Sequence, residues 1–356
     1  MVKFLLTKNR SCGILFYAIF TKTLPKRREL NKMLTSVLLF AVGLVLLIKG
    51  GDWFVDGATG IAKRFNLPDI VVGATVVSIG TTLPEVMVST TGALAGSGAM
   101  AYGNAIGSII CNTALIAAIS ITCNPGPVNV KSMKTPVIFF FGSAALYCFA
   151  SYVLGEFPRW MGFVMLGIFV VYTVLTVRNG LKNPDAGAEE EEEESKPKAL
   201  WQELLLLVAG AAVIAVGADL LVDHGQIIAL ELGVPETVVA LLFVALGTSL
   251  PELVTTITSL KKGRASLGVG NVIGANVFNL VLVSGVAVSL APFPVPMENE
   301  LLNTGLNMSL VFEIPVVLGV MTLMAVPALL SKKLGRWQGI ALLAIYAAFC
   351  VCQFVL

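Results

Sequence analysis

Two glutamates, Glu85 and Glu252, stand inside long apolar stretches of the chain, and each closes the same short motif. The motif reads GTTLPE at 80–85 and GTSLPE at 247–252. A charged side chain at the centre of a bilayer costs about 2.5–3.5 kcal/mol on insertion scales. The sequence places no Lys, Arg or His at comparable depth. We therefore expect the two carboxylates to be compensated by a bound cation.

Groups that carry oxygen surround both glutamates. A proline in a helix frees the carbonyl about four residues back, and Pro84 and Pro251 stand directly before the two glutamates. We predict that both helices are broken there, which leaves free carbonyls near Ser78, Gly80, Ala245 and Gly247. Hydroxyls and carboxamides complete an all-oxygen set: Thr81, Thr82, Thr248, Ser249, Asn112 and Asn279. Hard cations prefer such ligands, and calcium takes about six to eight oxygens.

The same motifs fit the S/T-x-x-E capping box, from Thr82 to Glu85 and from Ser249 to Glu252. In that motif the hydroxyl and the glutamate each accept a hydrogen bond from a backbone N–H at the start of a helix. We predict that both boxes form, because a cap implies a new helix start at the proposed break. For Asn112 and Asn279, hydrogen bonding between helices is the alternative to binding an ion.

The elements that must position these residues are membrane-spanning helices. Of the 356 residues, 56% are hydrophobic and 13% are charged, about half the charged fraction of a soluble domain. A spanning segment must satisfy its own backbone, so the apolar runs are predicted to be helices. There are ten such runs: 34–51, 69–94, 103–123, 135–154, 160–178, 200–222, 236–260, 270–291, 307–330 and 337–356.

Composition also excludes several classes of protein. The formal charge of +2 implies no bulk affinity for nucleic acid, and the single His excludes His-rich metal or haem sites. The six Cys lack C-x-x-C spacing, so we interpret them as small residues within the membrane rather than as a disulfide or metal framework. We expect no cofactor and no obligate protein partner. No nucleophile–base pair is evident, so we do not expect an enzyme.

The chain contains an internal repeat. A shift of 167 residues places GTTLPE on GTSLPE, and GNAIGSIICN at 103–112 on GNVIGANVFN at 270–279. We predict a first five-helix repeat at 33–182 and a second at 200–356. Because five is odd, the second copy must enter the membrane inverted. Inverted repeats are typical of secondary transporters, whose site lies at the midplane between the halves. The predicted fold class is an all-α membrane protein of ten helices, with the second and seventh broken at the motif.

Basic residues predict the orientation. Fifteen of them lie in the loops after the odd-numbered runs and at the flanking span ends, and only Arg159 lies on the other side. By the positive-inside rule the first group is cytoplasmic, and both ends of the ten-helix core face outward. Residues 183–199, with six consecutive glutamates, are predicted to be a cytoplasmic linker, with a calcium-attracting role as an alternative. The basic tail at 1–32 conflicts with this orientation, so we expect translation to start at Met33.

The paired GTTLPE/GTSLPE and GNAIGS/GNVIGA motifs resemble those of the cation/calcium exchanger superfamily, and most closely those of its prokaryotic sodium/calcium antiporters. The resemblance covers roughly residues 33–356. It implies exchange of Na⁺ for Ca²⁺ by alternating access in the cytoplasmic membrane, with both ions as substrates. It also implies that Glu85 and Glu252 are shared central carboxylates. The other ligands that it implies are Thr81, Thr82, Ser108, Thr248 and Ser249, with the carbonyls of Ser78 and Ala245.

The sequence departs from this family in two places. Ala275 stands where the family motif usually has Ser, opposite Ser108 in the other repeat, which weakens one expected sodium position. Asn112 and Asn279 stand where some relatives carry Asp, which lowers the charge of the site and argues against potassium co-transport.

The charge of the site suggests why ions would be exchanged. Two carboxylates without counter-charge make an empty site difficult to occlude in a low-dielectric core. One Ca²⁺ or at least two Na⁺ would cancel that charge, so we expect a carrier that closes only when loaded. Proton-coupled calcium exchange is the nearest alternative, because buried carboxylates also titrate. A cation channel with a glutamate filter is a less favoured one.

Two aspartate pairs lie at equivalent ends of the first and sixth runs. Asp52 and Asp56 match Asp219 and Asp223 at the same shift of 167. A spacing of four puts the members of each pair on one side of a helix. They would either attract cations to the two mouths of the carrier or anchor the helix ends at the interface.

Overall fold

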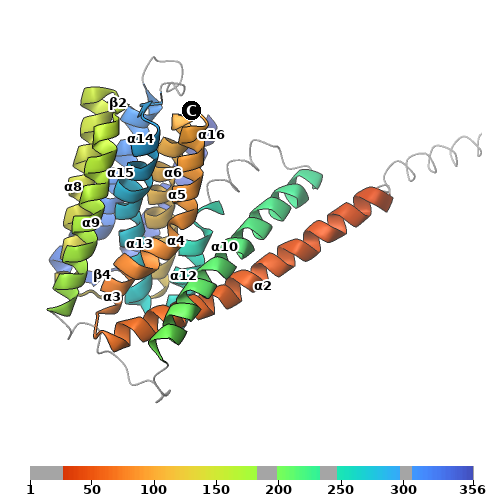
Figure 1. Cartoon of the computed structure of the whole chain (residues 1–356), viewed down its shortest axis with the longest axis horizontal. Coiled ribbons are helices and arrows are strands. Elements are labelled where there is room, and N and C mark those ends of the chain that lie inside the picture. The colour runs from red at the N-terminus through yellow and green to blue at the C-terminus, as the bar shows by residue number, and fades with distance from the viewer. Residues whose placement is uncertain (1–26, 183–198, 233–246, 297–306, 356) are drawn as a thin grey trace, which may run out of the picture.

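The structure is a computed structural model that describes residues 27–182, 199–232, 247–296 and 307–355 (Figure 1). Within these ranges, eight helical segments are long and apolar enough to cross a membrane. Several contain a π-helical turn, labelled η. The segments are α2 (Arg27–Arg64), α6 with η2 and α7 (Gly98–Cys111, Asn112–Ala117 and Ala118–Cys123), α8 with η3 (Val130–Phe149 and Ala150–Leu154), α9 (Arg159–Leu181), α10 (Leu200–Glu231), α13 with η5 and α14 (Ala265–Phe278, Asn279–Val283 and Ser284–Leu290), η7 with α15 (Ser309–Glu313 and Ile314–Ser331) and α16 (Arg336–Val355).

A ninth segment qualifies only if two helices on either side of a break are counted as one span. Helices α3 (Asp69–Val72), η1 (Gly73–Val77) and α4 (Ser78–Thr81) run without interruption, and α5 (Leu83–Leu94) then leaves at an angle of 45°. In the second half, α12 (Leu250–Lys261) follows the corresponding motif. Most of the predicted run before it, residues 236–246, lies outside the described residues, so the count of ten helices stays a prediction.

The two longest helices, α2 and α10, lie side by side and run obliquely to the remaining bundle in Figure 1. They are antiparallel, since Gly43 of α2 lies against Gly217 of α10, and Gly50 lies against Gly210. These glycines repeat every seven residues on each helix. Within a membrane, small residues at this spacing let two backbones approach closely.

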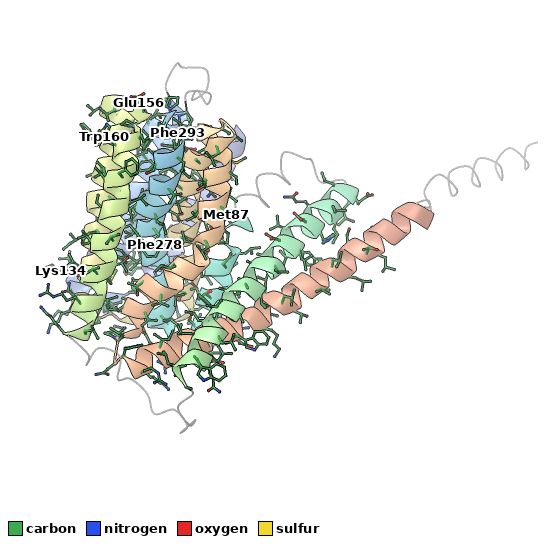
Figure 2. All side chains as sticks on the ribbon, in the orientation of Figure 1. Met87, Lys134, Glu156, Trp160, Phe278 and Phe293 are labelled. Carbon is green, nitrogen blue, oxygen red and sulfur yellow. The ribbon has the colours of Figure 1, made fainter. Side chains whose placement is uncertain are left out.

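Two short antiparallel ladders join the first half of the chain to the second. Strand β1 (Gly126–Pro127) pairs with β4 (Lys333–Leu334), and β2 (Glu156–Phe157) pairs with β3 (Phe293–Pro294). In Figure 2, Glu156 and Phe293 lie at one end of the bundle with Trp160, and Lys134 lies at the other end. Each ladder therefore connects loops that are far apart in the sequence.

The two Arg-Trp sequences, which match at a shift of 177 residues, make equivalent contacts. Arg159 begins α9 and donates to the carbonyl of Leu290 at the end of α14, with an N–O distance of 3.1 Å. Arg336 begins α16 and donates to the carbonyl of Thr122 in α7, at 3.0 Å. Carbonyls at the end of a helix lack a partner within the helix and favour a cation. Each half thus caps a helix of the other half.

Helix α13 is the centre of the bundle, and each of its residues from Leu267 to Phe278 is buried. Helices α3, η1 and α4 pack directly on it through glycines. A Cβ atom at Gly73 would collide with the carbonyl of Leu267 and would lie 2.8 Å from the backbone nitrogen of Asn271. A Cβ atom at Gly274 would collide with the Ser78 hydroxyl. The two motif regions therefore meet at backbone distance.

We predict that G73A destabilises the protein by about 1–3 kcal/mol, because the added methyl group meets rigid backbone and over-packs the interface. Thermal unfolding of the purified protein in detergent should show a transition several degrees lower. G167A on α9 is the matched control, since no atom lies within 4 Å of a Cβ built at that position. A G73A protein that unfolds together with G167A and the wild type would show that the backbones are not in close contact.

Candidate cation site

Glu85 and Glu252 lie in the first turns of α5 and α12, and both are completely buried. All four of their carboxylate oxygens lack a hydrogen-bond partner. The two carboxylates are close enough to repel each other. The hydroxyls of Thr81 and Thr82 lie next to the Glu252 carboxylate, without hydrogen-bond geometry to it. Hydroxyls of the first half thus lie beside the carboxylate of the second.

The predicted capping boxes are wrong. Neither Thr82 nor Ser249 makes a side-chain cap hydrogen bond. An N-cap residue normally has extended backbone angles, which turn its side chain toward the first helical N–H groups. Here the backbone stays near helical values, with φ −87° and ψ −2° at Thr82 and φ −91° and ψ 5° at Ser249. The hydroxyls of both residues remain unpaired and buried, so they are free to serve as ligands.

The carbonyl of Ser78, expected to be free, accepts a hydrogen bond from the backbone nitrogen of Thr82 at 3.0 Å. The chain therefore bends at Thr82 while this helical hydrogen bond is kept. A carbonyl oxygen has two lone pairs, so this bond leaves one for a cation. The matching position in the other repeat, Ala245, lies outside the described residues.

Asn112 and Asn279 occupy equivalent places in the two halves. Each is completely buried and begins a π-helical turn, η2 or η5. Both atoms of each carboxamide lack a hydrogen-bond partner. The alternative prediction, that these residues bond to neighbouring helices, is thus not what the structure shows. The Ser108 hydroxyl, one turn before Asn112, is also buried and unpaired. Isolated π-helical turns occur frequently at functional sites.

Two asparagines of the G-N-x-I-G motifs have a role that was not predicted. Asn271 of α13 accepts a hydrogen bond from the Thr81 hydroxyl at 3.2 Å. Asn104 of α6 accepts the equivalent bond from Thr248 at 3.3 Å. Each asparagine therefore holds the motif threonine of the opposite repeat. The matching shift of 167 between both pairs was visible in the sequence, but only the fold shows that they meet.

Both asparagines make further contacts around the site. The Ser78 hydroxyl lies 2.9 Å from the backbone carbonyl of Asn271 and 3.2 Å from its side-chain oxygen. The Asn104 amide donates to the backbone carbonyl of Glu85 at 3.2 Å and to the Ser89 hydroxyl at 2.8 Å. The residues next to both carboxylates are thus held by cross-helix hydrogen bonds.

A tyrosine fixes the π-helical turn that precedes the first motif. The buried Tyr172 hydroxyl of α9 donates to the carbonyl of Ala74 in η1 at 2.8 Å. The Tyr172 ring also packs edge-on against Phe278, the residue before Asn279. One side chain thereby touches both helices that carry site residues.

The site as a whole consists of two carboxylates and neutral oxygens, in a region that contains no protein cation. Among the described residues, no group of three or more His, Cys, Asp or Glu side chains could hold a metal ion. Buried polar groups without partners are destabilising unless something else satisfies them. A hard cation fits this donor set, because it would coordinate the orphaned oxygens and balance the charge.

Comparison with known proteins gives the family. The family model described as sodium/calcium exchanger protein matches twice, at residues 35–178 and 203–355. The sodium/calcium exchanger MaX1 of Methanosarcina acetivorans is 29% identical, over 90% of this chain and 98% of its own length. An uncharacterised membrane protein of Methanocaldococcus jannaschii is 35% identical, over 86% of this chain and 94% of its own length.

A solved structure agrees. The sodium-calcium exchanger NCX_Mj, soaked with Na⁺ and Sr²⁺, superimposes with a TM-score of 0.73 at 32% identity, and the match covers 90% of this chain and 99% of that one. The prediction of a multi-pass helical membrane protein is confirmed. The chain belongs to the sodium/calcium exchanger family and is a sodium/calcium antiporter.

Proposed function

We propose that Na⁺ and Ca²⁺ alternate at one site between Glu85 and Glu252, and that the carrier expels Ca²⁺ from the cell. The observation that carries this proposal is the pair of buried carboxylates without any partner, one from each half. The proposed ligands are these two groups with Thr81, Thr82, Thr248, Ser249, Asn112, Asn279, Ser108 and the carbonyls of Ser78 and Ala245. The only ions in this scheme are the two substrates, and no resident cofactor takes part.

The proposed architecture is ten helices in two inverted five-helix repeats, with the second and seventh broken at the motif. The double match of the family model supports the repeat, and the 45° bend at Thr82 supports the first break. The equivalent contacts of Arg159 and Arg336 at the two ends of the bundle also support it. We place the protein in the cytoplasmic membrane, with the linker at 183–199 inside and both ends of the core outside.

Charge balance gives the coupling. One Ca²⁺ or at least two Na⁺ neutralise the two carboxylates, so the empty site is the costly state to occlude. If three Na⁺ enter for each Ca²⁺ that leaves, one net charge crosses per cycle. A potential of 100 mV then contributes about 2.3 kcal/mol. Inward Na⁺ and a negative interior both drive Ca²⁺ out.

We predict that E85Q and E252Q each abolish Na⁺-gradient-driven Ca²⁺ flux in proteoliposomes, to the level of vesicles without protein. Each change halves the charge that balances Ca²⁺. E156Q, on the exposed strand β2, is the matched control and should transport like the wild type. Flux that survives both changes would place the site elsewhere, and flux that follows a pH gradient without Na⁺ would favour proton coupling.

We predict that N271A raises the Na⁺ concentration for half-maximal exchange by about 2- to 12-fold, because a lost hydrogen bond is worth about 0.5–1.5 kcal/mol. The hydroxyls of Ser78 and Thr81 would lose their acceptor. N276A is the control, since Asn276 is equally buried on α13 but bonds to Thr113. Equal shifts in the two variants would mean that only packing is affected. Sodium titration of Ca²⁺ efflux at fixed Ca²⁺ measures both.

We predict that Na⁺-driven Ca²⁺ efflux from proteoliposomes accelerates when potassium and valinomycin clamp the interior negative. Under three-for-one exchange, the net charge moves inward with Na⁺ and follows the potential. An electroneutral two-for-one carrier would give the same rate at zero and at negative potential, which would contradict the proposed stoichiometry.

A further inference from the structure

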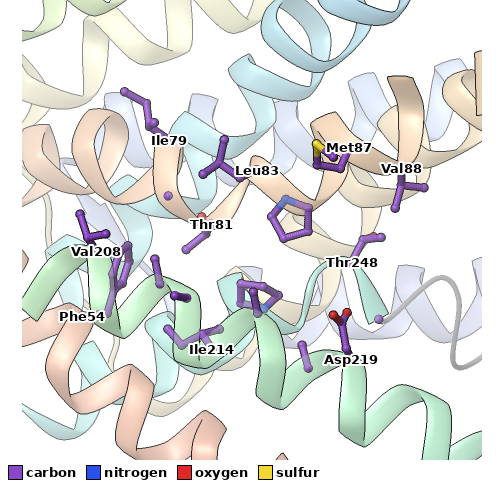
Figure 3. A pocket seen from close by; sticks show the side chains of 18 of the residues that line it. Phe54, Ile79, Thr81, Leu83, Met87, Val88, Val208, Ile214, Asp219 and Thr248 are labelled. Atoms are coloured by element: carbon purple, nitrogen blue, oxygen red, sulfur yellow. The ribbon is translucent and has the colours of Figure 1, made fainter. Parts of the chain in front are cut away.

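A pocket of about 860 Å³ opens beside the cation site, between α10 and the bent helix that carries the first motif (Figure 3). Most of its lining is apolar, with Phe54 and Ile214 on one side and Ile79 and Met87 on the other. Cavities that bind small organic molecules have volumes of about 300–1,000 Å³ and mostly apolar walls with few polar groups. This pocket matches that description.

The apolar rim of the pocket faces outward from the bundle. Leu83, Met87 and Val208 all line it, and their exposed fractions are 52%, 64% and 66%. They lie on helices whose length and composition suit a membrane. A molecule could therefore enter sideways from the lipid, provided that it has an apolar body.

Two carboxylates, Asp219 and Asp223 of α10, complete the lining. Figure 3 shows Asp219 on α10 near Thr248. The structure gives neither aspartate an ion pair within the described ranges. The pocket thus combines apolar walls with two negative charges near one another.

The repeat-related aspartates show that this charge is a property of one face only. Asp56 pairs with Lys262, with an N–O distance of 2.6 Å, and Asp52 lies 3.8 Å from the same ammonium group. Shifting Lys262 back by 167 residues gives position 95, which is Ala. The second half therefore neutralises the aspartates of the first, whereas the first half offers no equivalent lysine to Asp219 and Asp223.

We propose that this pocket binds an amphipathic organic cation, with its ammonium group at Asp219 and Asp223 and its apolar body against Phe54, Ile79 and Met87. Charge complementarity selects the cation, and the apolar walls require the body. A carboxylate pair near lipid attracts a cation more strongly than it would in bulk water, because the local dielectric constant is lower.

Occupation of the pocket has a consequence for exchange. Thr81 and Thr248, which are hydrogen-bonded to Asn271 and Asn104, also line the pocket. A molecule held there fills the space between α10 and the first motif, and so obstructs both ion access and relative movement of the helices. The bound amine is therefore an inhibitor. This consequence rests on the proposed function, whereas binding itself does not.

Binding is tested on the full-length protein in lipid nanodiscs with three probes. These are n-octylammonium, n-octanol, which lacks the charge, and tetramethylammonium, which lacks the body. Ligands that bind only the folded state raise its melting temperature. We expect a saturable rise with n-octylammonium and none with the other two. The same rise with n-octanol would identify a site for apolar chains such as lipid tails and would overturn the proposal, as would no rise with any probe.

Variants locate the site. The double change D219N/D223N should weaken n-octylammonium binding at least tenfold, and A215F should abolish it by filling the pocket from α10. D52N is the control, because Asp52 is the repeat-related residue outside the pocket. Equal weakening in D52N would overturn the proposal. Inhibition of Ca²⁺ flux is measured in parallel, so binding that persists when no exchange occurs separates a failure of the proposed function from a failure of this site.

Discussion

Two carboxylates buried in an apolar bundle without a protein cation are the constraint on which the rest of the structure depends. Glu85 and Glu252 are completely buried, and each repels the other. A buried charge normally requires a partner of opposite charge or a set of hydrogen bonds. Here the surrounding hydroxyls and carboxamides stay unpaired instead, and the protein keeps a cluster of oxygens whose best partner is a cation from outside. The stability of the site and its ion occupancy are therefore the same problem.

The two halves hold each other's functional groups, which links them mechanically. Thr81 bonds to Asn271, and Thr248 bonds to Asn104, so each motif threonine is oriented by the other half. At the ends of the bundle, arginines and short ladders join the halves in the same reciprocal way. A change in the relation between the halves must then alter the ligands of both at once. This arrangement suits an exchanger, which must expose one site to each side in turn.

Much of this could be predicted from the sequence, because the features concerned are local. Periodicity and composition showed apolar spans, and the unpaired glutamates followed from the lack of basic residues at their depth. The capping boxes failed because the backbone at Thr82 keeps near-helical angles through the bend, which a four-residue motif cannot reveal. The roles of Asn104, Asn271 and Tyr172 depend on which helices become neighbours. Those contacts are set by glycine-mediated packing on α13 and are visible only in the fold.

The repeats share a backbone plan, but their side chains have diverged, and the divergence is concentrated around the site. Lys262 neutralises Asp52 and Asp56, whereas Ala95 takes its place in the other half. Ser108 has a hydroxyl where Ala275 has none. Two identical inverted halves would make the inward- and outward-facing states equal in energy, since each would be the image of the other. Every such difference removes that equality. The two faces of the carrier are therefore chemically distinct, and what binds or pairs at one face has no counterpart at the other.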